Sequence, residues 1–176
     1  MKHNDHFFPV DLWSNKENKT LSQGDYVKIE GFLKHNVWKN QKQEWKHRTV
    51  IVVKNIMNNV ERKTHNFIDL NGIIVKNSKR IQNSKFREKN MVAVVVNTNI
   101  NKKSSYKNHL NVNFWNDLVS VGSKLKVGDQ VKIVGKLNTS SWKENVYDKW
   151  NQQVNIVAES LFLKEELKVD LQVKSR

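Results

Sequence analysis

GDYVKIEGFLKHNVW, at residues 24–38, recurs in altered form as GDQVKIVGKLNTSSW at residues 128–142. A shift of 104 positions aligns residues 24–58 with residues 128–162 without a gap, and eleven of the aligned residues are identical. Similarity at a fixed spacing within one chain is the signature of a repeated structural unit. We therefore expect the chain to contain two related units.

The repeat extends upstream with a slip of two residues, because VDLW at residues 10–13 matches VNFW at residues 112–115. Both copies alternate apolar and polar residues with a period of two, which is typical of strands with one buried face. Each copy therefore predicts a three-stranded unit. The residues expected on the buried face are Val27, Ile29, Gly31 and Leu33 in the first copy, and Val131, Ile133, Gly135 and Leu137 in the second.

Two glycines of this pattern, Gly31 and Gly135, fall at the same place in the repeat. A glycine on the buried side of a strand often marks the bend at which a barrel strand passes from one sheet into the next. We therefore expect both strands to bend there. The alternative is a glycine that only tolerates weak packing.

Most of the remaining pattern is also short strands. Helix signals are limited to one or two turns at residues 116–124 and to the tail at residues 161–171. Many short strands with little helix predict an all-β protein built as a small antiparallel barrel, and the oligonucleotide-binding (OB) barrel is the version that binds nucleic acid. The further strands are expected at residues 7–13, 49–54, 66–75, 91–97, 111–115 and 154–158.

The composition favours a polyanionic partner. The chain has 176 residues and a formal net charge of +14, which attracts nucleic acid. The longest purely apolar run, at residues 92–96, is too short to span a membrane, and neither an amphipathic membrane helix nor a lipid anchor is evident. Cysteine is absent and the first residues lack a secretory pattern, so we expect a cytoplasmic protein.

The second half of the chain resembles a known family. NFIDLNGIIV, AVVVNTN, VNFWNDL, LKVGDQVKIVGKLNTSSW and VNIVAESL follow one another between residues 66 and 163 in the order found in the bacterial single-stranded DNA-binding protein. Residues 6–58 resemble only the second half of that domain. The resemblance implies a partial OB-like unit of three strands at residues 1–60, a complete OB barrel at residues 61–165 and a tail at residues 166–176.

Aromatic residues are the candidates for stacking on bases. If Val112 and Phe114 face the core, Trp115 faces outward, and Val10 and Leu12 place Trp13 outward in the same way. The resemblance implies stacking by Trp115 and Trp142, and the repeat extends that role to Trp13 and Trp38. The alternative is that some tryptophans plug barrel ends or subunit interfaces. The full set of candidates is Trp115, Trp142, Trp150, Tyr147, Tyr106, Trp13, Trp38, Trp45 and Phe7.

Basic residues are the candidates for phosphate contacts. Nine Lys and Arg residues against the single acid Glu88 lie between residues 71 and 110, mostly in the connections between strands. The alternative is that these residues are simply charged side chains of solvated loops. The excess of positive charge, with Tyr106 among these residues, favours phosphate contact. The candidates are Lys76, Lys79, Arg80, Lys85, Arg87, Lys102, Lys103, Lys107, Lys143 and Lys39.

Catalytic patterns are missing from the sequence. We find no phosphate-binding glycine loop, no dinucleotide fingerprint, no HExxH and no nucleophile elbow. His3 and His6 have a spacing that could hold a metal, but no companion ligand accompanies them. We therefore expect a binding protein rather than an enzyme, with no cofactor and no metal.

The expected function is to coat and protect single-stranded DNA without strong sequence preference, in replication, repair or recombination. Three alternatives stay open: an accessory protein of the primosomal type, an RNA-binding OB protein, and a structural subunit whose tryptophans are interface plugs. The end of the chain, KEELKVDLQVKSR, lacks the acidic tip with which the family recruits partner enzymes. The incomplete first unit leaves a sheet edge open, so a homodimer or homotetramer is expected.

Overall fold

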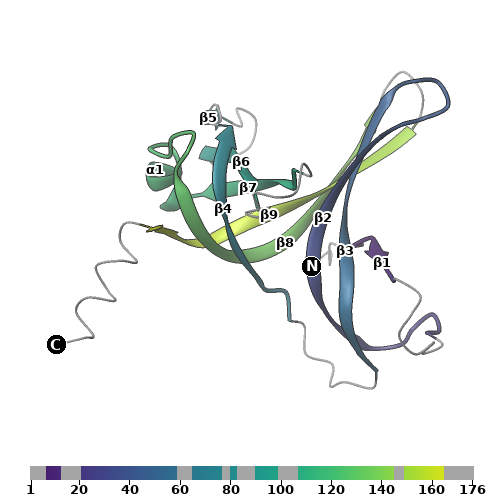
Figure 1. Cartoon of the computed structure of the whole chain (residues 1–176). Coiled ribbons are helices and arrows are strands. Elements are labelled where there is room, and N and C mark those ends of the chain that lie inside the picture. Colours follow the sequence, from purple (N-terminus) through teal and green to yellow (C-terminus); the bar gives the residue numbers. More distant parts are fainter. Residues whose placement is uncertain are drawn as a thin grey trace. The chain divides into compact units, whose positions relative to one another are not determined.

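The computed structural model describes residues 7–12, 21–58, 65–76, 80–82, 90–98, 107–144 and 149–164 (Figure 1). For residues 80–82, 90, 142–144 and 149–150 it describes the backbone alone. The chain divides into two compact units, residues 1–65 with 139–154 and residues 66–138 with 155–176. The predicted boundaries at residues 60 and 165 stay a prediction.

The second unit contains a closed ring of five strands. β4 pairs with β8 on one side and with β6 on the other, and the order β4-β8-β9-β7-β6 returns the sheet to its first strand. The pairing of β7 with β9 is parallel. This is the topology of an OB barrel, as predicted. The elements are β4 (Ile68–Lys76), β5 (Arg80–Gln82), β6 (Asn90–Asn97), β7 (His109–Trp115), α1 (Leu118–Gly122), β8 (Gln130–Glu144) and β9 (Lys149–Leu163).

Alternation along the strands gives the barrel its core. On β7 the even-numbered residues Leu110, Val112 and Phe114 are buried, while the odd-numbered residues are half-buried on the outer face. Valines of β6 and isoleucines of β4, β8 and β9 complete the interior. The short helix α1 also has two buried residues, Val119 and Gly122. Period-two patterning therefore predicted the buried positions of Val131, Ile133 and Gly135 correctly, whereas Leu137 is half-buried.

The Gly-Asp pair of the repeat forms the same turn in both units. Gly24 has a φ of 97° and Gly128 a φ of 100°, a left-handed backbone that favours glycine. The Asp25 carboxylate accepts a 2.7 Å hydrogen bond from the amide of Ser22. The Asp129 carboxylate accepts one of the same length from the amide of Lys126. The repeat thus preserves a turn that leads the chain into the long strand that follows it.

The N-terminal sheet has the connectivity of the second half of the barrel. Its order is β1-β3-β2, with β1 parallel to β3 and β2 antiparallel to it, just as β7 is parallel to β9. The amide of Ile51 on β3 donates to the carbonyl of Pro9, ahead of β1, at 2.9 Å. The predicted three-stranded unit is confirmed. The strands are β1 (Val10–Asp11), β2 (Val27–Lys39) and β3 (Trp45–Asn58).

The core of this sheet is small. Leu33, Val50 and Val52 are the buried apolar residues that the described part of the sheet contains. The expectation that Val10 and Leu12 face a core is wrong, because Leu12 is 58% exposed and Val10 is 37% exposed. Among the described residues this sheet has three hydrogen-bonded strands, in the order β1-β3-β2.

The glycine prediction is half correct. Gly135 is buried, but Gly31 is exposed, contrary to expectation. The pairing of β2 with β3 changes register between Glu30 and Gly31. The expected bend of the two strands stays a prediction. A Cβ on Gly31 would overlap the carbonyl oxygen of Val52, and one on Gly135 that of Val157. Both glycines therefore permit a close approach of the neighbouring strand.

Several predicted boundaries need correction. The strand expected at residues 7–13 is only β1, two residues long, and residues 49–54 are the middle of the much longer β3. Residues 161–163 were expected to be helical but continue β9, which ends at Leu163. No helix among the described residues is long and apolar enough to cross a membrane.

Candidate nucleic-acid interface

The outer face of the barrel carries a polar row on β7. His109, Asn111, Asn113 and Trp115 alternate with the core residues and are each half-buried. We call these four residues the β7 row. Amide groups both donate and accept hydrogen bonds, and an indole ring offers a flat face to a base. The row therefore combines one stacking ring with groups that suit more than one kind of base edge.

Apolar residues of β6 flank the β7 row. Met91 lies directly opposite Trp115, Ala93 opposite Asn113 and Val95 opposite Asn111. All of these side chains are half-buried. The two adjacent rows thus form a neutral face.

Lys76 brings positive charge to the edge of this face. It lies opposite Val95 on β6, and Val95 lies opposite Asn111 on β7. Adjacent strands are roughly 4.8 Å apart, so the backbone of Lys76 lies about 10 Å from that of Asn111. Its side chain is exposed, as is that of Lys107, two residues before β7. Within the described part of the chain neither lysine forms an ion pair.

The lysines of β8 differ, because acids neutralise them. Lys132 forms an ion pair with Asp69 at 3.1 Å, and Lys136 forms one with Glu159. These two lysines are therefore less available to a phosphate than a lysine without an acidic partner. The described cations without an acidic neighbour in the barrel include Lys76 and Lys107, at the connections where the sequence predicted phosphate contacts.

A clamp at the base of the β6–β7 connection was missed by sequence reasoning. Asn108 is buried, and its side-chain amide donates to the Thr98 hydroxyl at 2.7 Å. The Thr98 amide donates to the Asn108 carbonyl at 3.1 Å. The Asn108 amide also donates to the Asn97 side-chain oxygen at 3.3 Å. These bonds fix the two ends of the β6–β7 connection. Lys102, Lys103 and Tyr106, which are predicted to bind nucleic acid, belong to that connection.

In the N-terminal unit the β2–β3 hairpin carries aromatic rings and cations. Trp38 is 44% exposed and Trp45 is 67% exposed, and both were predicted. The Lys39 ammonium lies 5.1 Å from the centre of the Trp45 ring, close enough for a cation–π contact. Sequence reasoning missed further cations on the two strands, although WKHR at residues 45–48 is a clear signal: Lys34, Lys46, Arg48 and Lys54.

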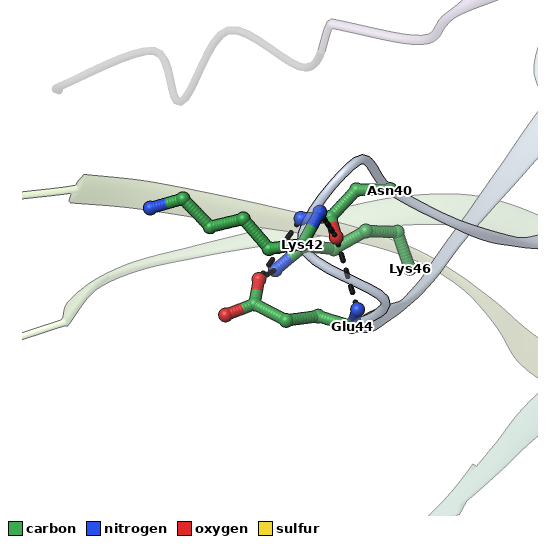
Figure 2. Close-up of polar contacts among 4 residues, drawn as sticks. All are labelled: Asn40, Lys42, Glu44 and Lys46. Atoms are coloured by element: carbon green, nitrogen blue, oxygen red, sulfur yellow. Dashed lines mark hydrogen bonds and ion pairs between the residues drawn. The ribbon is translucent and has the colours of Figure 1, made fainter.

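The tip of this hairpin is held by Asn40 (Figure 2). Its side-chain oxygen accepts hydrogen bonds from the amides of Lys42 at 3.0 Å and Glu44 at 2.9 Å. Its side-chain amide donates to the Glu44 carboxylate at 2.9 Å, and Lys46 forms an ion pair with the same carboxylate at 2.9 Å. Gln43 adopts the left-handed backbone that closes the loop, with a φ of 61°. The loop is thus an ordered turn.

Two carboxyl groups of this sheet have lowered pKa values. The hydrogen bond from Lys46, then that from Asn40 and the charge of Lys46, hold the pKa of Glu44 below its usual value. A hydrogen bond from Lys28, together with its charge, lowers the pKa of Glu30 in the same way. Each acid forms an ion pair with one lysine, Glu30 with Lys28 at 2.8 Å and Glu44 with Lys46 at 2.9 Å.

The remaining predicted residues are placed less fully. Phe7 is exposed, and its carbonyl accepts a 2.9 Å hydrogen bond from the side chain of Gln152. Trp142, Lys143, Trp150 and Arg80 have a described backbone only. Their proposed roles stay predictions. Outside the described residues lie Trp13, Tyr106, Tyr147, Lys79, Lys85, Arg87, Lys102 and Lys103.

Among the described residues, no three His, Cys, Asp or Glu side chains gather where they could hold a metal ion. His35 and His47 are close, with ring centres 5.6 Å apart, but His35 shares a hydrogen bond with the Thr49 hydroxyl.

The fold and this outer face define an OB barrel with a neutral, tryptophan-bearing surface bordered by lysines. The single-strand binding protein family matches residues 66–163, which is more than half of the chain. The chain therefore belongs to the single-strand binding protein family. A comparison with curated proteins finds no match.

Solved structures show the same fold. A deletion variant of the single-stranded DNA-binding protein from Thermus aquaticus superposes with a TM-score of 0.66 at 18% identity, over 82% of this chain and 63% of that protein. The wild-type Thermus aquaticus protein gives a TM-score of 0.64 at 19% identity, over 82% of this chain and 61% of that protein. This chain thus spans less than two thirds of either relative.

The Glu44 contacts give a titration that checks the tip geometry. In NMR titrations we expect Glu44 to have a pKa below its usual value, and Lys46→Gln or Asn40→Ala to raise that pKa. Because the folded pKa is lowered, the contribution to stability is present above the unfolded pKa and is lost as pH falls through the folded one. Lys28→Gln should raise the pKa of Glu30 and leave that of Glu44 unchanged. A Glu44 pKa that neither tip substitution moves contradicts this geometry.

Proposed function

We propose that this protein binds single-stranded DNA without strong sequence preference, on the outer face of its barrel. The observation that supports this most directly is the position of Trp115 at the end of the β7 row, inside the region that matches the family. A base stacked on an exposed aromatic ring gains roughly 1 to 3 kcal/mol, and every base has a face that can stack. The ring thus supplies affinity without reading sequence.

The amides of the β7 row support the same tolerance. Asn111 and Asn113 each carry one acceptor oxygen and a donor amine, so they suit the edge of any base. Met91, Ala93 and Val95 on β6 add apolar surface beside them. A face without charge accepts uncharged bases, while the phosphates turn toward the surrounding lysines.

Phosphate contacts follow from the placement of charge. Lys76 lies opposite Val95, which lies opposite Asn111. Single-stranded DNA bound on the β7 row therefore has a lysine within reach on the β6 side. The net charge of +14 also draws a polyanion to the molecule over longer distances. Neutralising phosphates releases counterions from the strand, which makes binding dependent on salt.

Several chains that assemble could together coat a longer stretch of DNA. The N-terminal sheet has an edge through which chains could assemble. Its order ends at β2, and no strand among the described residues pairs with the outer edge of β2. In the barrel the corresponding strand, β8, pairs there with β4 over residues 68–73. An unpaired strand edge is a template for another strand. We propose that the edge of β2 takes part in forming a homodimer or larger homo-oligomer.

Replacing Trp115 tests the proposed DNA site. Trp115→Ala should weaken binding of labelled oligothymidylate by about 1 to 3 kcal/mol, because one stacking platform is lost. Trp115→Phe keeps a ring and should lose much less. Fluorescence anisotropy titrations of the three proteins give the affinities. Equal affinities for all three would show that the β7 row does not stack on DNA.

Shortening the chain tests the proposed assembly. We expect sedimentation of the full chain at micromolar concentration to give a dimer or larger oligomer, and a chain beginning at Glu61 to give a smaller assembly. The reason is that removal of the N-terminal sheet removes its open edge. A monomeric full chain, or a shortened chain with the same assembly, would show that β2 does not join subunits.

A further inference from the structure

The β2–β3 hairpin has two faces, and each carries one tryptophan. Trp38 lies directly opposite Lys46, and Lys39 lies directly opposite Trp45. In an antiparallel pair, opposed residues share a face and successive residues alternate between faces. Trp38 and Trp45 therefore project from opposite faces of the same hairpin, and both rings are exposed.

The face with Trp38 carries three cations. Lys46 is opposite the tryptophan, Arg48 is opposite Asn36, and Lys34 is opposite Val50, all on this face. Arg48 is exposed. Lys46 forms an ion pair with Glu44, at the tip. We call these residues the Trp38 face.

The face with Trp45 carries a different set of basic side chains. Lys39 lies over the Trp45 ring at 5.1 Å. His47 is opposite Val37 and His35 is opposite Thr49, so both histidines are on this face, with ring centres 5.6 Å apart. We call these residues the Trp45 face. A base that stacks on this ring takes the place of the ammonium, which then becomes available to the adjacent phosphate.

The charge of the hairpin indicates what occupies these faces. Between residues 32 and 54 there are six Lys and Arg residues and one acid, Glu44, which the tip already holds. A flat exposed ring beside a cation is the arrangement that binds a base and its phosphate. An acidic protein surface needs the cations but gives no reason for an exposed ring on each face.

We propose that the β2–β3 hairpin holds single-stranded nucleic acid on both faces, one strand segment at Trp38 and another at Trp45. This site is outside residues 66–163, where the family matches. The proposal rests on the proposed function, because it assigns the same kind of ligand. A pleated sheet separates the two rings, so bases on them belong to separate segments. One chain can then bring two segments together.

Fluorine NMR of the full chain labelled with 5-fluorotryptophan tests this, with signals assigned by single Trp→Phe variants. The probe is a short oligothymidylate of about six nucleotides, near the lower site size of one binding unit. We expect both hairpin signals to shift on titration. Trp38→Ala should leave the apparent affinity seen at Trp45 within about twofold, and Trp45→Ala should do the same for Trp38. Sites that share no partner act independently.

Two matched charge variants test the faces without removing a ring. Arg48→Gln should weaken the titration seen at Trp38 by about threefold or more and leave that at Trp45 unchanged. Lys39→Gln should do the reverse. Both substitutions are at solvent-accessible positions of one hairpin. They therefore test the two-segment proposal even if a tryptophan variant fails to fold.

The outcomes separate this proposal from the proposed function. If Trp38→Ala weakens binding at Trp45 more than fivefold, one segment contacts both faces and the two-segment proposal is wrong. If the Trp115 signal shifts while both hairpin signals stay still, the hairpin is not a nucleic-acid site but the barrel is. If no signal shifts, the proposed function fails as well.

Discussion

The pairing of β4 on both of its edges is the interaction on which the barrel depends. One edge of the strand bonds to β8 over residues 68–73, and its last residues bond to β6 over residues 73–76. Only with both contacts does the sheet close and the interior around Phe114 become dry. Closure makes one face of β7 the interior, so the alternate residues of that strand, the β7 row, lie on the outer face.

The N-terminal sheet shows what the same sequence pattern does without that strand. It keeps the Gly-Asp turn, the two long strands and the parallel third strand, but its described part has a buried core of only three apolar residues. Leu12, which corresponds to the fully buried Phe114, is exposed. An open sheet with charged, aromatic strands is suited to binding other molecules rather than to enclosing a core. Its proposed roles in assembly and in holding DNA both follow from this openness.

The fold was largely predictable because it depends on local rules. The repeat predicts the three-stranded N-terminal unit, and period-two alternation predicts which side of β7 is buried. The candidate site was less predictable, since it depends on pairing between distant residues. The sequence does not show that Asp69 neutralises Lys132, that Asn108 clamps a connection, or that Trp38 and Trp45 lie on opposite faces.

The most direct test of the central claim is the salt dependence of binding to oligothymidylate, compared with a duplex of equal length. If bases stack on the β7 row while lysines neutralise phosphates, the single strand binds more tightly. The logarithm of its binding constant then falls linearly with the logarithm of salt concentration, with a slope of about 0.7 per neutralised phosphate. Binding that ignores salt, or that favours the duplex, contradicts a single-strand interface on this face.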